Sequence, residues 1–251
     1  MLNQLPRPTI FAHRGASAYA PENTLAAFEL ALRQGADGIE LDAKLTADGQ
    51  VVVIHDQTVN RTTEGSGRVK DLTLAELRKL DAGSHFDVAF KGEPIPTLDE
   101  VLKAVGQMTI LNIELTNYAS ITDALPEKVA VLVKRHKLTR RVIFSSFNPI
   151  ALIRIRKMLP DVPIGLLAMP GKRGALARSL VGRFLAYQSL HLNHADVTPA
   201  LVKNSHQRGC YLYVYTVNQA ADMRRLLNMD VDGIFTDDPV LARQIISYAE
   251  H

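Results

Sequence analysis

Residues 38–56 read GIELDAKLTADGQVVVIHD, two short apolar runs separated by a polar turn and each followed by acidic or histidine side chains. The runs Gly38–Leu41 and Val51–Ile54 have the length and composition of buried strands. Asp48-Gly49 between them is a strong hairpin signal, which would make the flanking segments antiparallel. The stretch therefore predicts a strand pair, and one of its members need not belong to a larger parallel sheet.

Beyond this stretch, apolar runs alternate with helical segments along the chain, which predicts an α/β fold with a parallel sheet. The number of units favours a closed TIM (β/α)8 barrel. Since a barrel of this kind has eight strands, one of the predicted strands should lie outside it. The predicted strands are Thr9–Ala12, Gly38–Leu41, Val51–Ile54, Thr109–Leu115, Arg141–Ser145, Pro163–Ala168, Ser189–Leu192, Tyr211–Tyr215 and Gly233–Thr236. The predicted helices are Thr24–Gln34, Leu74–Leu80, Leu98–Val105, Pro126–His136, Ile150–Met158, Pro199–Arg208, Ala220–Asn228 and Val240–Ala249.

The regular alternation breaks between Gln57 and Pro96, where glycines are frequent and one short helix is predicted. We interpret this stretch as a small insertion after the third strand, an insertion subdomain of residues 57–96 over the catalytic end of the barrel. The whole chain, residues 1–251, is expected to form a single TIM-barrel domain.

The composition is that of a compact globular protein: 251 residues, 47% hydrophobic and 22% charged. A net charge of +3 without a block of lysines and arginines does not indicate a nucleic-acid partner. The single cysteine, Cys210, excludes an intrachain disulfide and fits a reducing compartment. Neither a secretory signal nor an apolar stretch of roughly 18 residues is found. We therefore expect a cytoplasmic protein with no stable membrane association, and a homodimer is compatible with the sequence.

The segment Lys172–Phe184 mixes basic and apolar side chains. A helix lying on a membrane surface is one interpretation. We favour an ordinary outer helix of the barrel, because such helices are amphipathic too.

Three carboxylates at predicted strand ends indicate a metal site. Glu40 and Asp42 are two residues apart, so on a strand both point to the same face, which at the end of a barrel strand is the mouth of the barrel. Carboxylates this close repel each other unless a cation lies between them, and oxygen ligands suit Mg²⁺ or Ca²⁺. Glu114, at the end of another run, supplies a third ligand. An isolated Glu-x-Asp pair is more often simply exposed to solvent. Here the other carboxylate and the histidines at neighbouring strand ends favour the interpretation that the pair binds one divalent cation.

His13 and His55 each end an apolar run. A lone histidine in such a place is usually structural, but two beside a carboxylate cluster predict an acid–base pair. One would activate the attacking oxygen and the other would protonate the leaving alkoxide. Arg14 can form a two-pronged contact with phosphate oxygens, and Gly15 would let the backbone approach the anion. Asp56 either orients His55 or begins a loop.

Other residues near strand ends receive less specific interpretations. Phe147, Tyr215 and Asn218 lie just past predicted strands and could line a substrate pocket, although a place in the core is an equally good interpretation for the two aromatic rings. Pro21–Thr24 is interpreted mainly as a helix start.

Taken in order, these motifs resemble those of the glycerophosphodiester phosphodiesterases. The resemblance covers nearly the whole chain, and the ordered set is highly specific although no single motif is decisive. The matching segments are HRG at 13–15, PENT at 21–24, GIELD at 38–42, TADG at 46–49, VVVIHD at 51–56, PTL at 96–98, NIEL at 112–115, SSF at 145–147, YTVN at 215–218 and GIFTD at 233–237.

The resemblance implies a TIM barrel related to the phosphatidylinositol-phospholipase-C type and a divalent metal at Glu40, Asp42 and Glu114. It implies that His13 and His55 act as general acid and base. Arg14 would bind the phosphate. The substrate would be a small glycerophosphodiester such as glycerophosphocholine or glycerophosphoethanolamine, and the products sn-glycerol 3-phosphate and an alcohol. In several members of the family the 2-hydroxyl of glycerol is thought to assist as an internal nucleophile.

The chain departs from the family pattern at Thr116. The family usually has a lysine there, two residues after the third carboxylate, in contact with the phosphate. A missing cation should weaken the stabilisation of the transition state. Lys44 shares the strand parity of Glu40 and Asp42 and is a candidate to replace it, but we expect its side chain to point to solvent.

Two other functions are compatible with this pattern. A lysophospholipid substrate would make the protein a lysophospholipase D, although the absence of a membrane anchor counts against this. A non-catalytic phosphate-binding barrel is the alternative from a different class of protein. Its support is Thr116, and the presence of both histidines and all three carboxylates argues against it.

Overall fold

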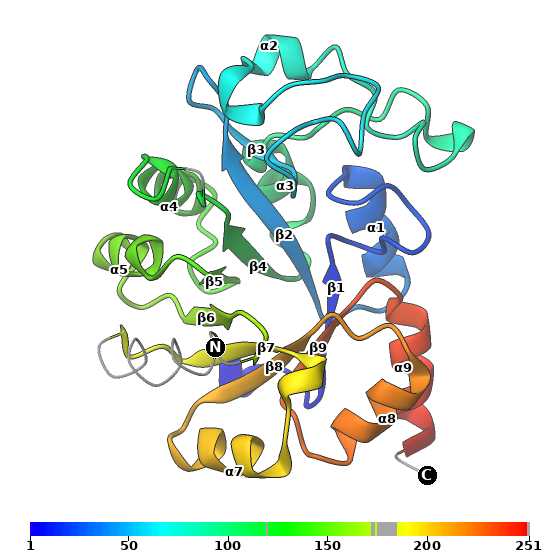
Figure 1. The fold of residues 1–251 in the computed structure, drawn as a ribbon, viewed down its shortest axis with the longest axis vertical. Coiled ribbons are helices and arrows are strands. Elements are labelled where there is room, and N and C mark those ends of the chain that lie inside the picture. The colour runs from blue at the N-terminus through cyan, green and yellow to red at the C-terminus, as the bar shows by residue number, and fades with distance from the viewer. Residues whose placement is uncertain (119, 172–173, 175–184, 250–251) are drawn as a thin grey trace.

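Eight parallel strands close into a barrel (Figure 1). The computed structural model describes residues 1–118, 120–171, 174 and 185–249. The strands follow one another around the ring in the order β1-β9-β8-β7-β6-β5-β4-β2, and the pairing of β1 with β2 closes it. The predicted TIM barrel is confirmed. The barrel strands are β1 (Thr9–His13), β2 (Gly38–Leu45), β4 (Ile110–Leu115), β5 (Val142–Ser146), β6 (Ile164–Ala168), β7 (Ser189–Asn193), β8 (Tyr211–Tyr215) and β9 (Gly233–Thr236).

The ninth strand lies outside the barrel. This strand, β3 (Val51–Val53), pairs antiparallel with the end of β2, where Val53 lies opposite Ala43. The turn between them contains Gly49 at a φ of 72°, and the Thr46 hydroxyl oxygen accepts a hydrogen bond within it. The hairpin predicted at this turn is therefore confirmed, and the extra strand is the one that follows it.

Helices surround the barrel, and side-chain caps fix several of their starts. The hydroxyl oxygens of Thr24 and Thr97 accept hydrogen bonds from the first turns of α1 and α3, as N-caps do.

No helix of the described residues is long and apolar enough to cross a membrane. The predicted segment Lys172–Phe184 lies outside the described residues except for Gly174. The helices are α1 (Leu25–Arg33), α2 (Leu74–Leu77), α3 (Leu98–Val105), α4 (Leu125–Arg135), α5 (Pro149–Met158), α7 (Pro199–Gln207), α8 (Ala220–Leu227) and α9 (Pro239–Ala249), with 3₁₀ turns at Leu2–Gln4, Val69–Asp71, Val88–Phe90 and His194–Asp196.

An aromatic cluster fills the barrel interior. The Phe11 ring stacks on Phe235 with centroids 5.0 Å apart and meets the Tyr213 ring edge-on at 5.2 Å. Leu2, in the N-terminal 3₁₀ turn, packs against the same cluster. Phe11 and Phe235 precede polar strand-end residues by two positions, so the cluster lies one layer below those residues. The cluster forms an apolar layer directly beneath the polar side chains at the strand ends.

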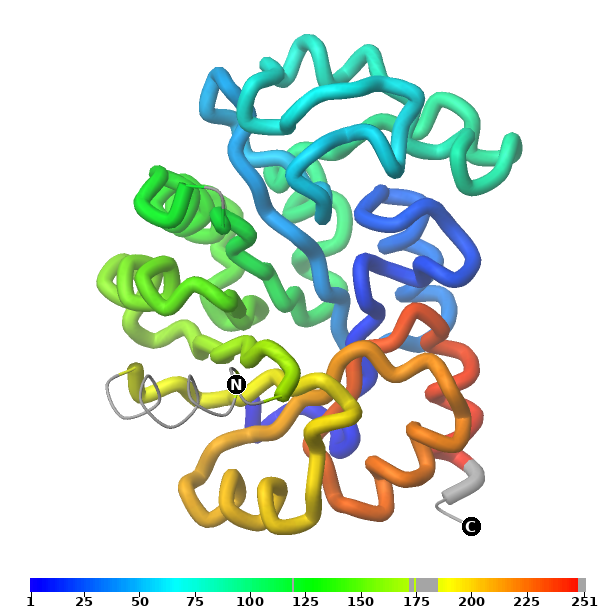
Figure 2. Tube along the Cα trace, in the orientation of Figure 1, coloured from blue at the N-terminus to red at the C-terminus, as the bar shows by residue number. Residues whose placement is uncertain are grey.

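Residues 57–96 form a small lobe beside β3, at the opposite end of the view from α7 (Figures 1 and 2). The lobe shares an apolar cluster with the β3 segment, which explains why the extra strand is buried although it lies outside the barrel. The buried members of this cluster are Val52, Ile54, Val59, Val69, Leu77, Ala82 and Ile95.

Gly15 is required by the packing of β1 against α1. Its φ is +86°, and a Cβ placed on it would lie 2.7 Å from the carbonyl carbon of Ala27. The neighbouring amide of Ala16 donates to the Ala27 carbonyl at 3.0 Å, so the two segments cannot separate without losing this bond. A backbone constraint therefore accounts for this glycine, and its predicted role in letting the backbone approach an anion stays a prediction.

We expect Gly15→Ala to lower the free energy of unfolding by more than Gly92→Ala does. Both substitutions place a side chain on left-handed backbone, at a cost of about 1–2 kcal/mol. At Gly92, however, nothing lies within 4 Å of the added Cβ, whereas the Cβ at Gly15 meets backbone atoms. Chemical denaturation of the two variants compares these costs. An equal or smaller loss for Gly15→Ala would mean that α1 moves aside without cost.

Candidate active site

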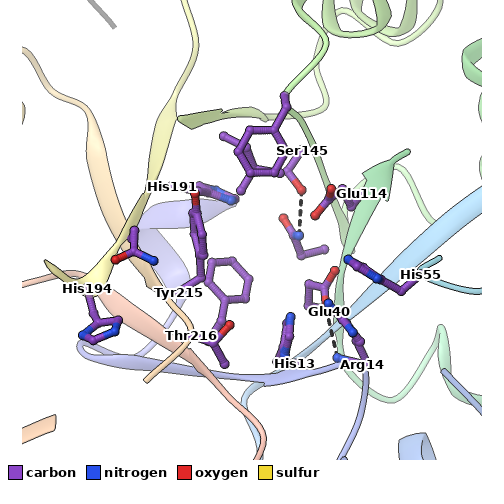
Figure 3. Close-up of a pocket in the computed structure, with 15 residues that line it drawn as sticks. His13, Arg14, Glu40, His55, Glu114, Ser145, His191, His194, Tyr215 and Thr216 are labelled. Carbon is purple, nitrogen blue, oxygen red and sulfur yellow. Dashed lines mark hydrogen bonds between the residues drawn. The ribbon is translucent and has the colours of Figure 1, made fainter. Parts of the chain in front are cut away.

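Three carboxylates meet at the carboxyl ends of β2 and β4. Glu40, Asp42 and Glu114, here called the acidic triad, each offer an oxygen, and these oxygens all lie within 4.8 Å of one another. The register of the two strands places Asp42 directly opposite Glu114. Glu40 and Asp42 are buried, and Glu114 is partly exposed in the pocket (Figure 3). The residues predicted to bind a metal are thus brought together.

The electrostatics of the acidic triad fit a divalent cation. Burial raises the pKa of Glu40 well above its usual range, and the charges of Asp42 and Glu114 raise it further. Burial and Asp42 raise the pKa of Glu114 to about 8. A hard cation accepts carboxylate oxygens as ligands and offsets the repulsion that these shifts reflect. The three residues would therefore suit Mg²⁺ or Ca²⁺.

Each carboxylate of the triad is also held by a hydrogen bond from a neighbour. The side-chain amide of Asn23 donates to Asp42 at 2.9 Å, and the backbone N–H of Arg14 donates to Glu40 at 2.9 Å. Tyr118 donates its hydroxyl to Glu114 at 2.6 Å. Thr24 caps α1 as predicted, but Asn23 beside it acts on the acidic site, a role that the sequence interpretation missed.

Both predicted catalytic histidines point into the same cavity, and each has a carboxylate partner (Figure 3). Nδ1 of His13 lies 2.7 Å from Oδ1 of Asp237, and Nδ1 of His55 lies 2.8 Å from Oδ1 of Asp56. Asp56 therefore orients His55, one of the two interpretations left open above. Because a carboxylate at Nδ1 accepts a proton there, both histidines are held in the form that leaves Nε2 free to exchange one.

Asp237 is a site residue that the sequence interpretation missed. Besides His13, it accepts hydrogen bonds from the Ser17 hydroxyl at 3.0 Å and from the Asn218 side-chain amide at 2.5 Å. It follows directly after β9, so the rule that drew attention to the other strand ends would have found it. Asn218 contributes by fixing Asp237.

Arg14 is nearly enclosed by carboxylates. Its Nη1 donates to Glu22 at 2.9 Å, and its Nε lies 3.5 Å from Asp42. Burial acts to lower the pKa of Arg14, but Asp42, Glu22 and Glu40 outweigh it and raise the pKa. The guanidinium therefore remains charged at the edge of the pocket, as a residue that contacts an anion must.

Arg61, in the lobe of residues 57–96, connects the two sides of the site and was also missed by the sequence interpretation. Its guanidinium donates to Glu22 through two bonds of 2.7 Å and to Asp56 through bonds of 2.8 and 3.3 Å. Burial acts to raise the pKa of Glu22, but the bonds from Arg61 and Arg14 lower it to about 2. Arg61 and His55 likewise lower the pKa of Asp56 to about 2. No local pattern in the sequence distinguishes Arg61 from an exposed loop arginine.

The pocket has a volume of about 420 Å³ and an aromatic wall. Phe147 and Tyr215 both line it, with ring centroids 6.2 Å apart, and Tyr118 packs against Phe147 at 5.9 Å. The Tyr215 hydroxyl donates to the Ala168 carbonyl at 2.6 Å, which fixes its ring. The residues around the pocket are His13, Arg14, Glu40, His55, Asn112, Glu114, Ser145, Phe147, Leu167, His191, Asn193, His194, Tyr215, Thr216 and Phe235.

Lys44 does not point to solvent, contrary to our expectation. Its exposed fraction is 5%, and Nζ donates to the Thr116 hydroxyl oxygen at 2.8 Å and to the Thr116 carbonyl at 3.3 Å. The reason is that β2 runs on to Leu45, past the predicted end at Leu41. Lys44 therefore keeps the inward direction of Asp42. Burial lowers the pKa of Lys44, while the Asp42 charge acts in the opposite direction.

Comparison with known proteins gives consistent matches over the whole fold. Residues 13–241 match the model of the Glycerophosphoryl diester phosphodiesterase family. A glycerophosphodiester phosphodiesterase of Caldanaerobacter subterraneus subsp. tengcongensis is 46% identical over 92% of this chain and 94% of its own length. The structure is similar to an Oleispira antarctica phosphodiesterase in complex with its product sn-glycerol-3-phosphate, with a TM-score of 0.87 and 32% identity over 96% of this chain and 97% of that one. A glycerophosphodiester phosphodiesterase from Agrobacterium tumefaciens has a TM-score of 0.82 and 35% identity over 94% and 99%.

We expect the metal-free protein to lose stability as the pH rises towards 8. The folded pKa of Glu114 is about 8, against an ordinary value of 4.5, so the folded protein binds this proton more tightly than the unfolded chain does. The stabilisation is complete below about pH 4.5 and is lost as the pH passes through about 8. The raised pKa of Glu40 acts in the same direction.

Thermal unfolding of wild type and Glu114→Gln, in chelator and in Mg²⁺ or Ca²⁺, measures this effect. The difference in unfolding temperature between the two proteins isolates the contribution of Glu114. Buried His191, whose pKa is lowered to about 3, is present in both and does not affect this difference. Their difference should change with pH in chelator and much less with the cation present. A difference that is constant with pH in chelator would contradict the shift.

Proposed function

Because the chain belongs to the glycerophosphoryl diester phosphodiesterase family, whose members are phosphoric diester hydrolases, we propose that it cleaves small glycerophosphodiesters with the help of one divalent cation. The products would be sn-glycerol 3-phosphate and an alcohol such as choline or ethanolamine. The observation that carries the proposal is the acidic triad beside two carboxylate-paired histidines around one pocket. The cytoplasmic location expected from the sequence stays a prediction.

Glu40, Asp42 and Glu114 would hold the cation. When bound, Mg²⁺ or Ca²⁺ supplies positive charge that stabilises the negative charge growing on phosphoryl oxygens. The neighbouring donors Asn23 and Tyr118 keep two of the carboxylates facing inward, so the site is organised before the substrate arrives.

His13 and His55 would move the protons of the reaction. One Nε2 accepts a proton from the attacking water as its oxygen bonds to phosphorus, and the other donates a proton to the alkoxide oxygen whose bond to phosphorus breaks, so that no free hydroxide or alkoxide has to form. Asp237 and Asp56 stabilise the positively charged form of each ring. The charged guanidinium of Arg14 would bind the phosphate oxygens.

We expect release of sn-glycerol 3-phosphate from glycerophosphocholine to require a divalent cation. Protein stripped with EDTA should be inactive and should recover with Mg²⁺ or Ca²⁺, whereas His13→Ala and Glu40→Ala should remain inactive with either ion. Parallel assays with glycerophosphoethanolamine and with a detergent-dispersed lysophospholipid show which alcohol groups the enzyme accepts and whether it accepts a substrate with an acyl chain. Full activity in EDTA would contradict the metal site, and cleavage of the lysophospholipid alone would replace the proposed substrate.

We expect Asp237→Asn to lower kcat by about 100-fold or more, the lower range of what acid–base catalysis contributes. An amide at this position no longer stabilises a protonated His13. The matched control is Asp238→Asn. Asp238 accepts from the Tyr19 hydroxyl at 2.8 Å and from the first turn of α9. Wild-type turnover for Asp237→Asn, or an equal loss for Asp238→Asn, would remove Asp237 from the catalytic arrangement.

A further inference from the structure

Lys44 is a buried ammonium group without a carboxylate partner. It extends from the same face of β2 as Glu40 and Asp42, and in the part of the chain that the structure describes no carboxylate oxygen lies within 4.0 Å of its Nζ. A lysine buried in this way is unusual, because burying a charge is costly unless an opposite charge accompanies it. The ammonium therefore has no direct ion-pair partner among the described residues and is available to a bound anion.

Thr116 holds the ammonium in place. Its hydroxyl donates to the Ala43 carbonyl at 2.7 Å, so the hydroxyl oxygen is left to accept from Lys44. The backbone N–H of Thr116 donates to the same carbonyl at 3.2 Å, which fixes the residue against β2. Because the proton of this hydroxyl is already engaged, Thr116 serves to position Lys44. Two of the three N–H groups of the ammonium meet Thr116, and the third remains for another acceptor.

The position of Lys44 places its charge beside the acidic triad. Asp42 and Glu114 pair directly across β2 and β4, so Lys44 and Thr116 form the next inward-facing pair along the same strands. With a strand rise of about 3.3 Å per residue, the Lys44 backbone lies about 7 Å beyond that of Asp42, a distance that a flexible lysine stem can span. Electrostatic attraction from Asp42 and Glu114 acts on the ammonium in the present structure.

The excess of carboxylates at the site also favours a role for this lysine. The acidic triad and Glu22 bring four negative charges to the site, while Arg14 and a divalent cation would offset three of them. Arg61 and Asp56 balance each other. Lys44 adds a positive charge to this acidic site, and without it an anionic phosphodiester would meet a more negative potential.

We propose that Lys44 is a phosphate-binding residue of this active site, delivered from β2 and held at the barrel mouth by Thr116. The proposal rests on the proposed function for the identity of the substrate. The ligand it recognises, an oxyanion of phosphate, is common to substrate, product and inorganic phosphate.

The test removes the positive charge of Lys44 from β2 and, in a second variant, places a positive charge at position 116, directly after β4. Lys44→Met removes the ammonium. The double variant Lys44→Met/Thr116→Lys restores an ammonium at position 116, the residue that the Lys44 ammonium now contacts. Lys103→Met, on the exposed side of α3, is the matched control for loss of one positive charge. All proteins are assayed with Mg²⁺ or Ca²⁺, by calorimetric binding of sn-glycerol 3-phosphate and of inorganic phosphate, and by kcat and KM on glycerophosphocholine.

We expect Lys44→Met to weaken binding of both phosphate ligands by about 10-fold or more, the value of one charge-assisted hydrogen bond, and to lower kcat/KM by a similar factor. The double variant should recover most of this loss, and Lys103→Met should behave as wild type. Thermal stability of Lys44→Met should be unchanged or higher, because an unpaired buried charge is removed. Should the methionine variant fail to fold, Lys44→Gln takes its place.

Unchanged phosphate binding in a folded Lys44→Met protein would overturn the proposal. So would a double variant that binds no better than the single one. Loss of sn-glycerol 3-phosphate binding in Lys44→Met, in an enzyme that cleaves no glycerophosphodiester, would support the role of Lys44 while refuting the proposed substrate. The binding and turnover measurements thus separate the two proposals.

Discussion

The central constraint on this molecule is the repulsion among three carboxylates at one end of a closed barrel. Burying Glu40, Asp42 and Glu114 side by side raises the pKa of Glu40 and Glu114, so the cluster costs stability unless positive charge and hydrogen-bond donors surround it. The chain supplies those donors from segments far apart in sequence, including Asn23 and the backbone of Arg14. Much of the polar structure at this end follows from that need.

The barrel explains why strand ends were informative in the sequence. Parallel strands in a ring bring all their carboxyl ends to one mouth, so polar residues that end separate apolar runs become neighbours. The aromatic layer of Phe11, Tyr213 and Phe235 closes the interior directly beneath. The strand-end residues His13 and Asp237, 224 positions apart, meet for this reason alone. The fold, most element boundaries and the acidic triad could therefore be predicted from local patterns.

What could not be predicted depends on register or on long-range contacts. The side chain of Lys44 faces inward because β2 continues to Leu45, at the start of the hairpin turn. The polar residues of this stretch give no sign in the sequence that the strand continues. Which run was the extra strand depended on pairing, since an isolated apolar run does not show whether its neighbour is parallel. The close approach of Gly15 to Ala27 likewise depends on tertiary packing and has no signal in the local sequence.

Arg61 makes the lobe of residues 57–96 a structural part of the candidate active site. Glu22 holds Arg14 and Asp56 holds His55, and the single guanidinium of Arg61 binds both of these carboxylates. Because the planar guanidinium of Arg61 binds two acceptors at once, the side of the pocket that carries Arg14 and the side that carries His55 keep a set separation. The lobe packs on β3 through its own apolar cluster, so the stability of that cluster is coupled to the geometry of the site. The lobe of residues 57–96 is therefore constrained by the ion pairs of Arg61 with Glu22 and Asp56, whereas an ordinary surface loop would be free to vary.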